Sequence, residues 1–168
     1  MIFSLYIYNR QGFCIHYQSF HRSRNSKMPH HEEFKLVFGL IYSIRGISQK
    51  LGPNFSSKEN FTSYQTNTYK LTLLTIPSGL KFILLTDTQQ STENIQQCLQ
   101  ELYSRTFYNY VIRHSKWLKI TKYTEEENGR KIEGGKDLIS GKSDLVSYLN
   151  KGFVEKTKEY MESLPFYN

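Results

Sequence analysis

The sequence predicts one α+β domain in three layers, with a five-stranded antiparallel sheet, one long helix on one face and two helices on the other. Two observations carry this prediction. Apolar segments with β-type composition and tight turns alternate with long segments of helical periodicity, in the order strand, strand, helix, three strands, helix, helix. The length of 168 residues suits a single domain with its own core, which we expect over residues 1–168.

The first twenty residues predict a β-hairpin. Its strands, Ile2–Tyr8 and Phe13–Phe20, are rich in Ile, Tyr and Phe, which fit a pleated surface. The turn between them ends in Gly12, where a positive φ is easiest. The first strand is apolar on both faces and is expected near the centre of the sheet, whereas the mixed second strand suits a place nearer the edge.

Three further strands predict an antiparallel meander. They are expected at Phe61–Thr66, Tyr69–Ile76 and Leu80–Thr86, joined by turns at Asn67-Thr68 and Pro77-Ser78-Gly79. The polar composition of the first of these strands predicts an edge position, where a strand either is protected or pairs with something else.

The long helix is expected from His31 to Leu51, because acidic residues occupy its first turn and Gly52-Pro53 stops it. Its predicted core stripe follows the helical period and consists of Val37, Leu40, Ile41, Ile44, Ile47 and Leu51.

A second apolar strip is predicted on the same helix, pointing away from the core stripe. It contains Leu36, Phe38 and Tyr42. A surface helix needs only one apolar face, so this strip indicates a binding partner, unless loops of the same domain cover Phe38 and Tyr42.

Two glycines interrupt this helix at a seven-residue spacing. Gly39 and Gly46 each cost about 1 kcal/mol relative to alanine, and they share a face with Tyr42 and Ser43. Alanine is absent from the whole sequence, so glycine is one available small residue here. The shared face nevertheless favours close contact with another chain.

The C-terminal third predicts two helices separated by a long connection. The first, Thr92–His114, is capped by Ser91 or Thr92, and the second is expected over Ser143–Ser163. The charged, glycine-containing stretch between them predicts a flexible insertion at 117–142. The predicted inward stripes consist of Ile95, Leu99, Leu102, Tyr103, Thr106 and Tyr110 on the first helix, and of Leu145, Leu149, Phe153 and Tyr160 on the second.

Composition excludes several classes of function. The formal charge of +7 suggests a nucleic-acid ligand, but a chain without alanine and rich in Lys, Asn, Ile, Tyr and Phe reflects AT-rich codons, so no nucleic acid is expected. No apolar run approaches the ~20 residues that span a bilayer. The apolar N-terminus lacks the features of a signal peptide, and two cysteines indicate a reduced, cytosolic compartment.

Catalytic and metal-binding patterns are equally scarce. The sequence has no glycine-rich phosphate loop and no nucleophile elbow. His21, His30 and His31 cluster in a basic loop, but cysteine or carboxylate ligands at metal-site spacing do not accompany them. Cys14, within a predicted strand, is interpreted as a small hydrophobic residue. We therefore expect no catalytic residues, no cofactor and no metal.

Several runs of the sequence resemble a known family. The most specific is KLVFGLIYSIR at 35–45, and the others are YNRQGFC at 8–14, YQSFHR at 17–22, YKL at 69–71, PSGLK at 77–81, TD at 86–87 and SLPF at 163–166. Together they resemble the first small subunit of the TRAPP (transport protein particle) vesicle-tethering complex, a longin-like (profilin-like) group that includes sedlin and synbindin. The chain departs from the family pattern at Asn9, where Asp is common, and in the longer insertion.

This resemblance implies a non-catalytic structural subunit in transport between endoplasmic reticulum and Golgi. It implies partners among other TRAPP subunits, including a synbindin-like one, and a Rab-type GTPase for which the complex is a guanine nucleotide exchange factor. It also implies a cytoplasmic location, peripheral at cis-Golgi and endoplasmic reticulum membranes. For this role the predicted interface residues are Lys35, Phe38, Gly39, Tyr42, Ser43, Arg45, Gly46, Phe61 and Tyr64.

Three other functions remain open from the sequence. The longin domain of a vesicle SNARE has this fold, but SNARE heptads and a C-terminal membrane helix are missing here. A small coat-adaptor subunit has the same order of strands and helices without the run at 35–45. An RNA-binding sheet would need aromatic residues exposed on one sheet face, whereas helices are expected to cover both.

Overall fold

The computed structural model describes residues 1–21, 29–50, 62–114, 117 and 151–167. The predicted insertion at 117–142 therefore lies outside the described residues, except for Trp117. The elements are β1 (Ile2–Tyr8), β2 (Cys14–Ser19), α1 (His30–Lys50), β3 (Ser63–Gln65), β4 (Lys70–Thr75), β5 (Lys81–Thr86), α3 (Thr92–Glu101), η1 (Leu102–Ile112) and α7 (Lys151–Glu162).

The five strands form one antiparallel sheet in the order β2-β1-β5-β4-β3. The predicted position of β1 inside the sheet is confirmed, and all its residues except Phe3 are buried. The predicted edge positions of β2 and β3 are confirmed as well. β3 is shorter than predicted and begins at Ser63, while Phe61 lies outside the described residues.

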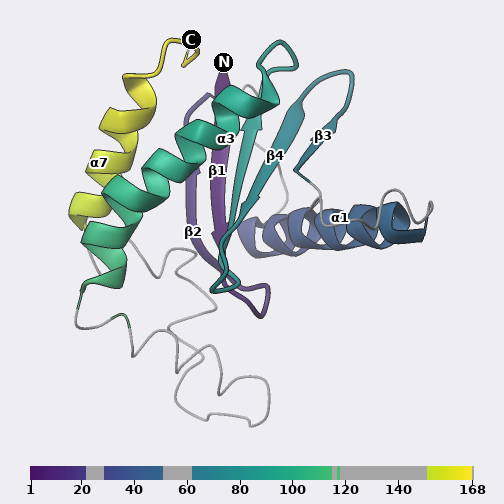
Figure 1. Cartoon of the computed structure of the whole chain (residues 1–168), viewed down its shortest axis with the longest axis horizontal. Helices are drawn as coiled ribbons and strands as arrows, with labels where there is room; N and C mark the ends of the chain where they lie inside the picture. The colour runs from purple at the N-terminus through teal and green to yellow at the C-terminus, as the bar shows by residue number, and fades with distance from the viewer. Residues whose placement is uncertain (22–28, 51–61, 115–116, 118–150, 168) are drawn as a thin grey trace, which may run out of the picture.

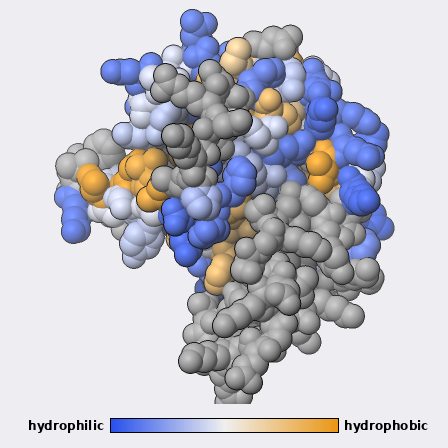
Figure 2. Space-filling view, turned by 180° about the vertical axis from the view of Figure 1, so that it is seen from behind, coloured by the Kyte–Doolittle hydropathy of each residue, from blue (hydrophilic) through white to orange (hydrophobic). Residues whose placement is uncertain are grey.

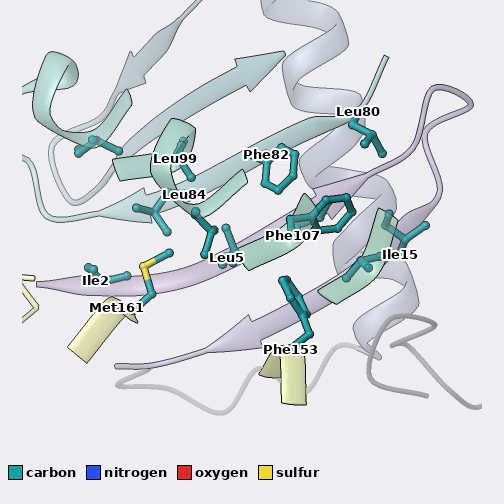
Figure 3. Close-up of a cluster of buried hydrophobic side chains, with 14 residues drawn as sticks. Ile2, Leu5, Ile15, Leu80, Phe82, Leu84, Leu99, Phe107, Phe153 and Met161 are labelled. Atoms are coloured by element: carbon teal, nitrogen blue, oxygen red, sulfur yellow. The ribbon is translucent and has the colours of Figure 1, made fainter. Parts of the chain in front are cut away.

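Helices lie on both faces of the sheet, as predicted (Figure 1). On one face α1 covers a cluster of seven buried residues, Tyr6, Tyr8, Phe34, Ile41, Leu71, Leu73 and Ile83. On the other face, side chains of α3, η1 and α7 meet those of the strands in the larger cluster of Figure 3. There Phe107 contacts Phe82 and Phe153 edge-on, at ring-centroid distances of 5.1 and 5.7 Å.

Two glycine turns lie side by side at one end of the sheet. Gly12, in the β1–β2 turn, has φ +93°, and a Cβ on it would lie 2.6 Å from the ring of Phe38. Gly79, in the β4–β5 turn, has φ +90°, and a Cβ on it would lie 2.9 Å from the side chain of Arg10. The first turn therefore packs against α1 and the second against the first. The side chain of Asn9 closes the first turn by accepting a hydrogen bond from the Phe13 amide, at 2.9 Å.

The helix predicted at 92–114 is confirmed in extent, but its second half has a different hydrogen-bond pattern. Ser91 caps α3 by accepting from the Asn94 amide, as predicted. Along η1 the helix is of the π type, and at its end the Arg113 amide donates to the Tyr108 carbonyl five residues back. Tyr110 is half-buried and packs against the core, which agrees with its predicted inward position. The wider turn also brings Phe107 and Val111, which were not predicted to face inward, into the fully buried stripe.

The C-terminal helix α7 packs across α3 and η1, with Phe153, Thr157 and Met161 buried. Tyr160, which was predicted to face inward, is half-buried, and its hydroxyl donates to the Glu101 carboxylate at 3.1 Å. The first part of the predicted helix, with Leu145 and Leu149, lies outside the described residues.

Candidate subunit interface

The outer face of α1 carries three of the five large hydrophobic side chains that are exposed among the described residues. Tyr42 is 74% exposed, Leu36 60% and Ile47 58%. Figure 2 shows apolar residues gathered over α1, at the left of that view. The prediction that Leu36 and Tyr42 point away from the core is confirmed.

The exposure of Ile47 corrects the predicted core stripe. Ile41 is the last buried residue of α1, because the C-terminal half of the helix extends past the β3 edge of the sheet (Figure 1). Ile47 therefore has no strand beneath it and joins the exposed apolar residues. Leu51, also predicted in the stripe, lies outside the described residues.

Phe38 is a second correction, since it was predicted to point away from the core. Its ring packs against Tyr8, with centroids 5.5 Å apart, and belongs to the partly buried rim of the α1-side core. Phe34, which was not predicted as a core residue, is 7% exposed and packs on the same sheet face. The spacing of Phe34, Phe38 and Ile41 is itself helical and would have identified this face.

The small residues of the predicted interface lie on open helix surface. Gly39 and Ser43 are exposed and Gly46 is half-buried. A Cβ on either glycine would meet no atom of another part of the described chain within 4 Å. Neither glycine is therefore required by a contact with another part of the described residues.

The remaining predicted interface residues flank this face. Lys35 and Arg45 are exposed on α1. Tyr64, on the edge strand β3, is half-buried and packs against the α1-side core opposite Leu71. The structure thus brings seven of the nine predicted residues together on α1 and adds Leu36 and Ile47 to them, while Tyr64 lies on β3.

Two buried phenols fix α1 on the sheet. The Tyr6 hydroxyl donates to Glu33 Oε1 at 2.7 Å, and the Tyr8 hydroxyl donates to the Phe34 carbonyl at 2.8 Å. Burial raises the pKa of both phenols well above the ordinary value. Neutral, hydrogen-bonded tyrosines therefore hold the N-terminal half of α1, so its outer face is presented in a fixed orientation.

The described residues show neither of two features that would suggest another kind of site. They contain no group of three His, Cys, Asp or Glu side chains placed to hold a metal ion. Among the described helices, none has the length and hydropathy of a membrane span.

Comparison with known proteins agrees with the resemblance read from the sequence. The Sybindin-like family model matches residues 2–117. The chain belongs to this family. Subunit 1 of the trafficking protein particle complex from Rattus norvegicus is 34% identical over 113 residues, covering 67% of the chain and 76% of the relative. Subunit BET5 of that complex from Saccharomyces cerevisiae is 31% identical over 145 residues, covering 83% and 88%.

Similarity to a solved structure is weaker. Myxococcus xanthus MglB is 10% identical, with a TM-score of 0.37 over 60% of this chain and 85% of that one. The relatives of the Sybindin-like family thus confirm the predicted family, and the strand order and helix layers above confirm the predicted α+β architecture.

Proposed function

We propose that this chain is a non-catalytic structural subunit of a TRAPP-type vesicle-tethering complex. The supporting observation is the outer face of α1, where Leu36, Tyr42 and Ile47 are all more than half exposed. Tyrosine is enriched at the cores of protein interfaces, and exposed apolar side chains gathered on one surface mark interaction sites. The relatives named as subunits of the trafficking protein particle complex support the same assignment.

Its partners are other TRAPP subunits, one of them synbindin-like. We propose that they bury Lys35, Phe38, Gly39, Tyr42, Ser43, Arg45 and Gly46, with Phe61 and Tyr64 at the β3 edge. A stable interface buries about 800 Å² per partner. The overhanging half of α1 offers area of this kind because no strand lies beneath it (Figure 1).

Within the complex the subunit contributes to a platform for guanine nucleotide exchange on a Rab-type GTPase, in transport from endoplasmic reticulum to Golgi. An exchange factor binds the nucleotide-free GTPase more tightly than the loaded form and weakens nucleotide binding by the same factor. Nucleotide exchange of this kind needs a rigid binding surface and no general acid, base or nucleophile. The complex places the chain in the cytoplasm, peripheral to Golgi and endoplasmic reticulum membranes.

Co-expression with the synbindin-like subunit of the same organism tests the proposal. We expect the two chains to co-purify as a complex, and Gly39→Trp to weaken it at least tenfold, because an indole would occupy the space of the partner. The matched control is Gln97→Trp, an exposed site on α3 across the sheet, which should bind as the unmodified chain does. Equal binding by both variants, with unchanged melting of the free chain, would refute the α1 interface.

A further inference from the structure

A group of cations surrounds the sheet end that carries the two glycine turns. The aliphatic part of the Arg10 side chain lies on Gly79, and the residue itself is exposed. Lys81 begins β5 beside this turn, and its Nζ donates to the Gly79 carbonyl at 3.3 Å. Its ammonium lies 5.7 Å from the centre of the Phe38 ring, so it faces α1.

One side of α1 continues this cationic surface. Lys35, Phe38, Tyr42 and Arg45 are spaced three and four residues apart, which places them on one side of a helix. Because Phe38 packs at the Gly12 turn, that side of α1 borders the turn end of the sheet. Burial lowers the pKa of Lys81, and Arg45 lies near enough that its positive charge lowers the pKa further.

The described residues supply these cations with no carboxylate partner. No ion pair between described residues involves Arg10, Arg45 or Lys81. Glu33 is engaged by the Tyr6 hydroxyl, and Asp87 follows the opposite end of β5. Cations therefore lie near one another at this end of the sheet, which is unfavourable for the free chain and becomes favourable when an anionic group binds beside them.

We infer that this turn end and the adjoining side of α1 form a docking surface for an acidic segment of a partner protein, whose carboxylates pair with Arg10, Arg45 and Lys81. The inference rests on the proposed function, because that function supplies the partner. It adds the chemistry of the contact, which is the pairing of carboxylates with cations. Tyr42 is 74% exposed on the same side of α1 and would add an aromatic anchor to this contact.

The position of Lys81 favours a protein over a membrane. A lipid surface attracts cations that project into solution, and each contributes about 1 kcal/mol near an anionic bilayer. Lys81 is only half-exposed, and its ammonium is held between the Gly79 carbonyl and the Phe38 ring. A carboxylate on a protruding side chain can approach such a half-buried ammonium, whereas a flat bilayer favours cations that project fully into solution.

The test compares the full chain with R10Q/R45Q/K81Q and with the control R105Q/R113Q/K151Q, which removes three exposed cations on, or just after, helices of the opposite face. Association rates are measured with each purified TRAPP small subunit and the Rab-type GTPase of the same organism, one at a time, at about 50 and about 300 mM salt. Phosphatidylserine vesicles serve as a separate probe.

We expect the first variant to slow association with at least one partner about tenfold at low salt and less than twofold at high salt, with the control unchanged. Partners that bind all three chains at equal rates would overturn the inference and leave the proposed function standing. Loss of vesicle binding alone would also overturn it, in favour of a lipid. Failure of the unmodified chain to bind any subunit would instead refute the proposed function. Thermal melting of each variant verifies that it is folded.

Discussion

The glycines on the outer face of α1 offer the sharpest test of whether that face is shaped for the free chain or for an assembly. Gly39 and Gly46 each lie in the interior of the helix, and a Cβ there would meet no atom from another part of the described residues within 4 Å. Replacing either by alanine removes a helix-propensity cost of about 1 kcal/mol without introducing a clash.

The two gains should add. Seven residues along a helix separate the sites by about 10 Å, beyond the range at which substitutions usually interfere. The double variant Gly39→Ala/Gly46→Ala is therefore expected to raise the free energy of unfolding by about 2 kcal/mol. For a domain of this size, that corresponds to a rise of about 4–8 °C in Tm.

Urea and thermal unfolding of the purified free chain measure this gain. Gly12→Ala is the matched control, because Gly12 combines φ +93° with a Cβ position 2.6 Å from Phe38 and should lose stability where the α1 variants gain it. An unchanged or lower Tm for the double variant would mean that another part of the chain approaches these glycines. The argument for a face kept small for a partner would then fail.

Three further predictions concern the packing of helices on the two faces of the sheet. Tyr8→Phe removes the hydroxyl that donates to the Phe34 carbonyl and should cost about 1 kcal/mol in urea unfolding at neutral pH. The pKa values of Tyr6 and Tyr8 are raised in the folded chain, so its stability should hold up to about pH 10, where unfolded phenols ionise, and fall above that pH. Thermal melting as a function of pH checks this, and the double variant Tyr6→Phe/Tyr8→Phe should lose less stability above about pH 10. Phe153→Ala should cost about 3–5 kcal/mol by loss of its contact with Phe107, and a smaller loss in urea unfolding would mean that α7 is only loosely docked.

The places of β1, β2 and β3 in the sheet followed from the composition of each strand. A strand apolar on both faces, such as β1, has to be covered on both, and a polar strand such as β3 suits an edge. The two turns could also be predicted, because Gly12 and Gly79 occupy the positions that require a positive φ. Such turns depend on residues that are close in sequence, and the place of a strand depends on how much of the whole strand is buried. The pattern of apolar and polar residues indicates both directly.

The errors have a common physical origin in tertiary geometry. Nothing in the sequence shows that α1 extends beyond the sheet, so Ile47 was placed in the core although only the stripe up to Ile41 is buried. The π-type turns of η1 shift burial to Phe107 and Val111, which a 3.6-residue period cannot anticipate. The inward position of Phe38 depends on the Gly12 turn packing beneath it, a contact between segments 26 residues apart in the chain.

The candidate interface could be predicted from the sequence only in part. The sequence shows that Leu36 and Tyr42 lie off the one helix face that can be buried, and the structure confirms that both are exposed. The cationic surface was not foreseen, because Arg10, Arg45 and Lys81 come from three elements that meet only in the fold.

Protection of position 42 in the assembled complex tests the central claim most directly. Tyr42→Cys places a thiol on the outer face of α1, with Gln97→Cys on α3 as the control, and labelling rates are compared between the free chain and the chain bound to its synbindin-like partner. We predict that the thiol at position 42 reacts quickly in the free chain and at least tenfold more slowly in the complex, while the thiol at position 97 reacts equally in both. Undiminished labelling at position 42 in a complex verified to be intact would contradict the account.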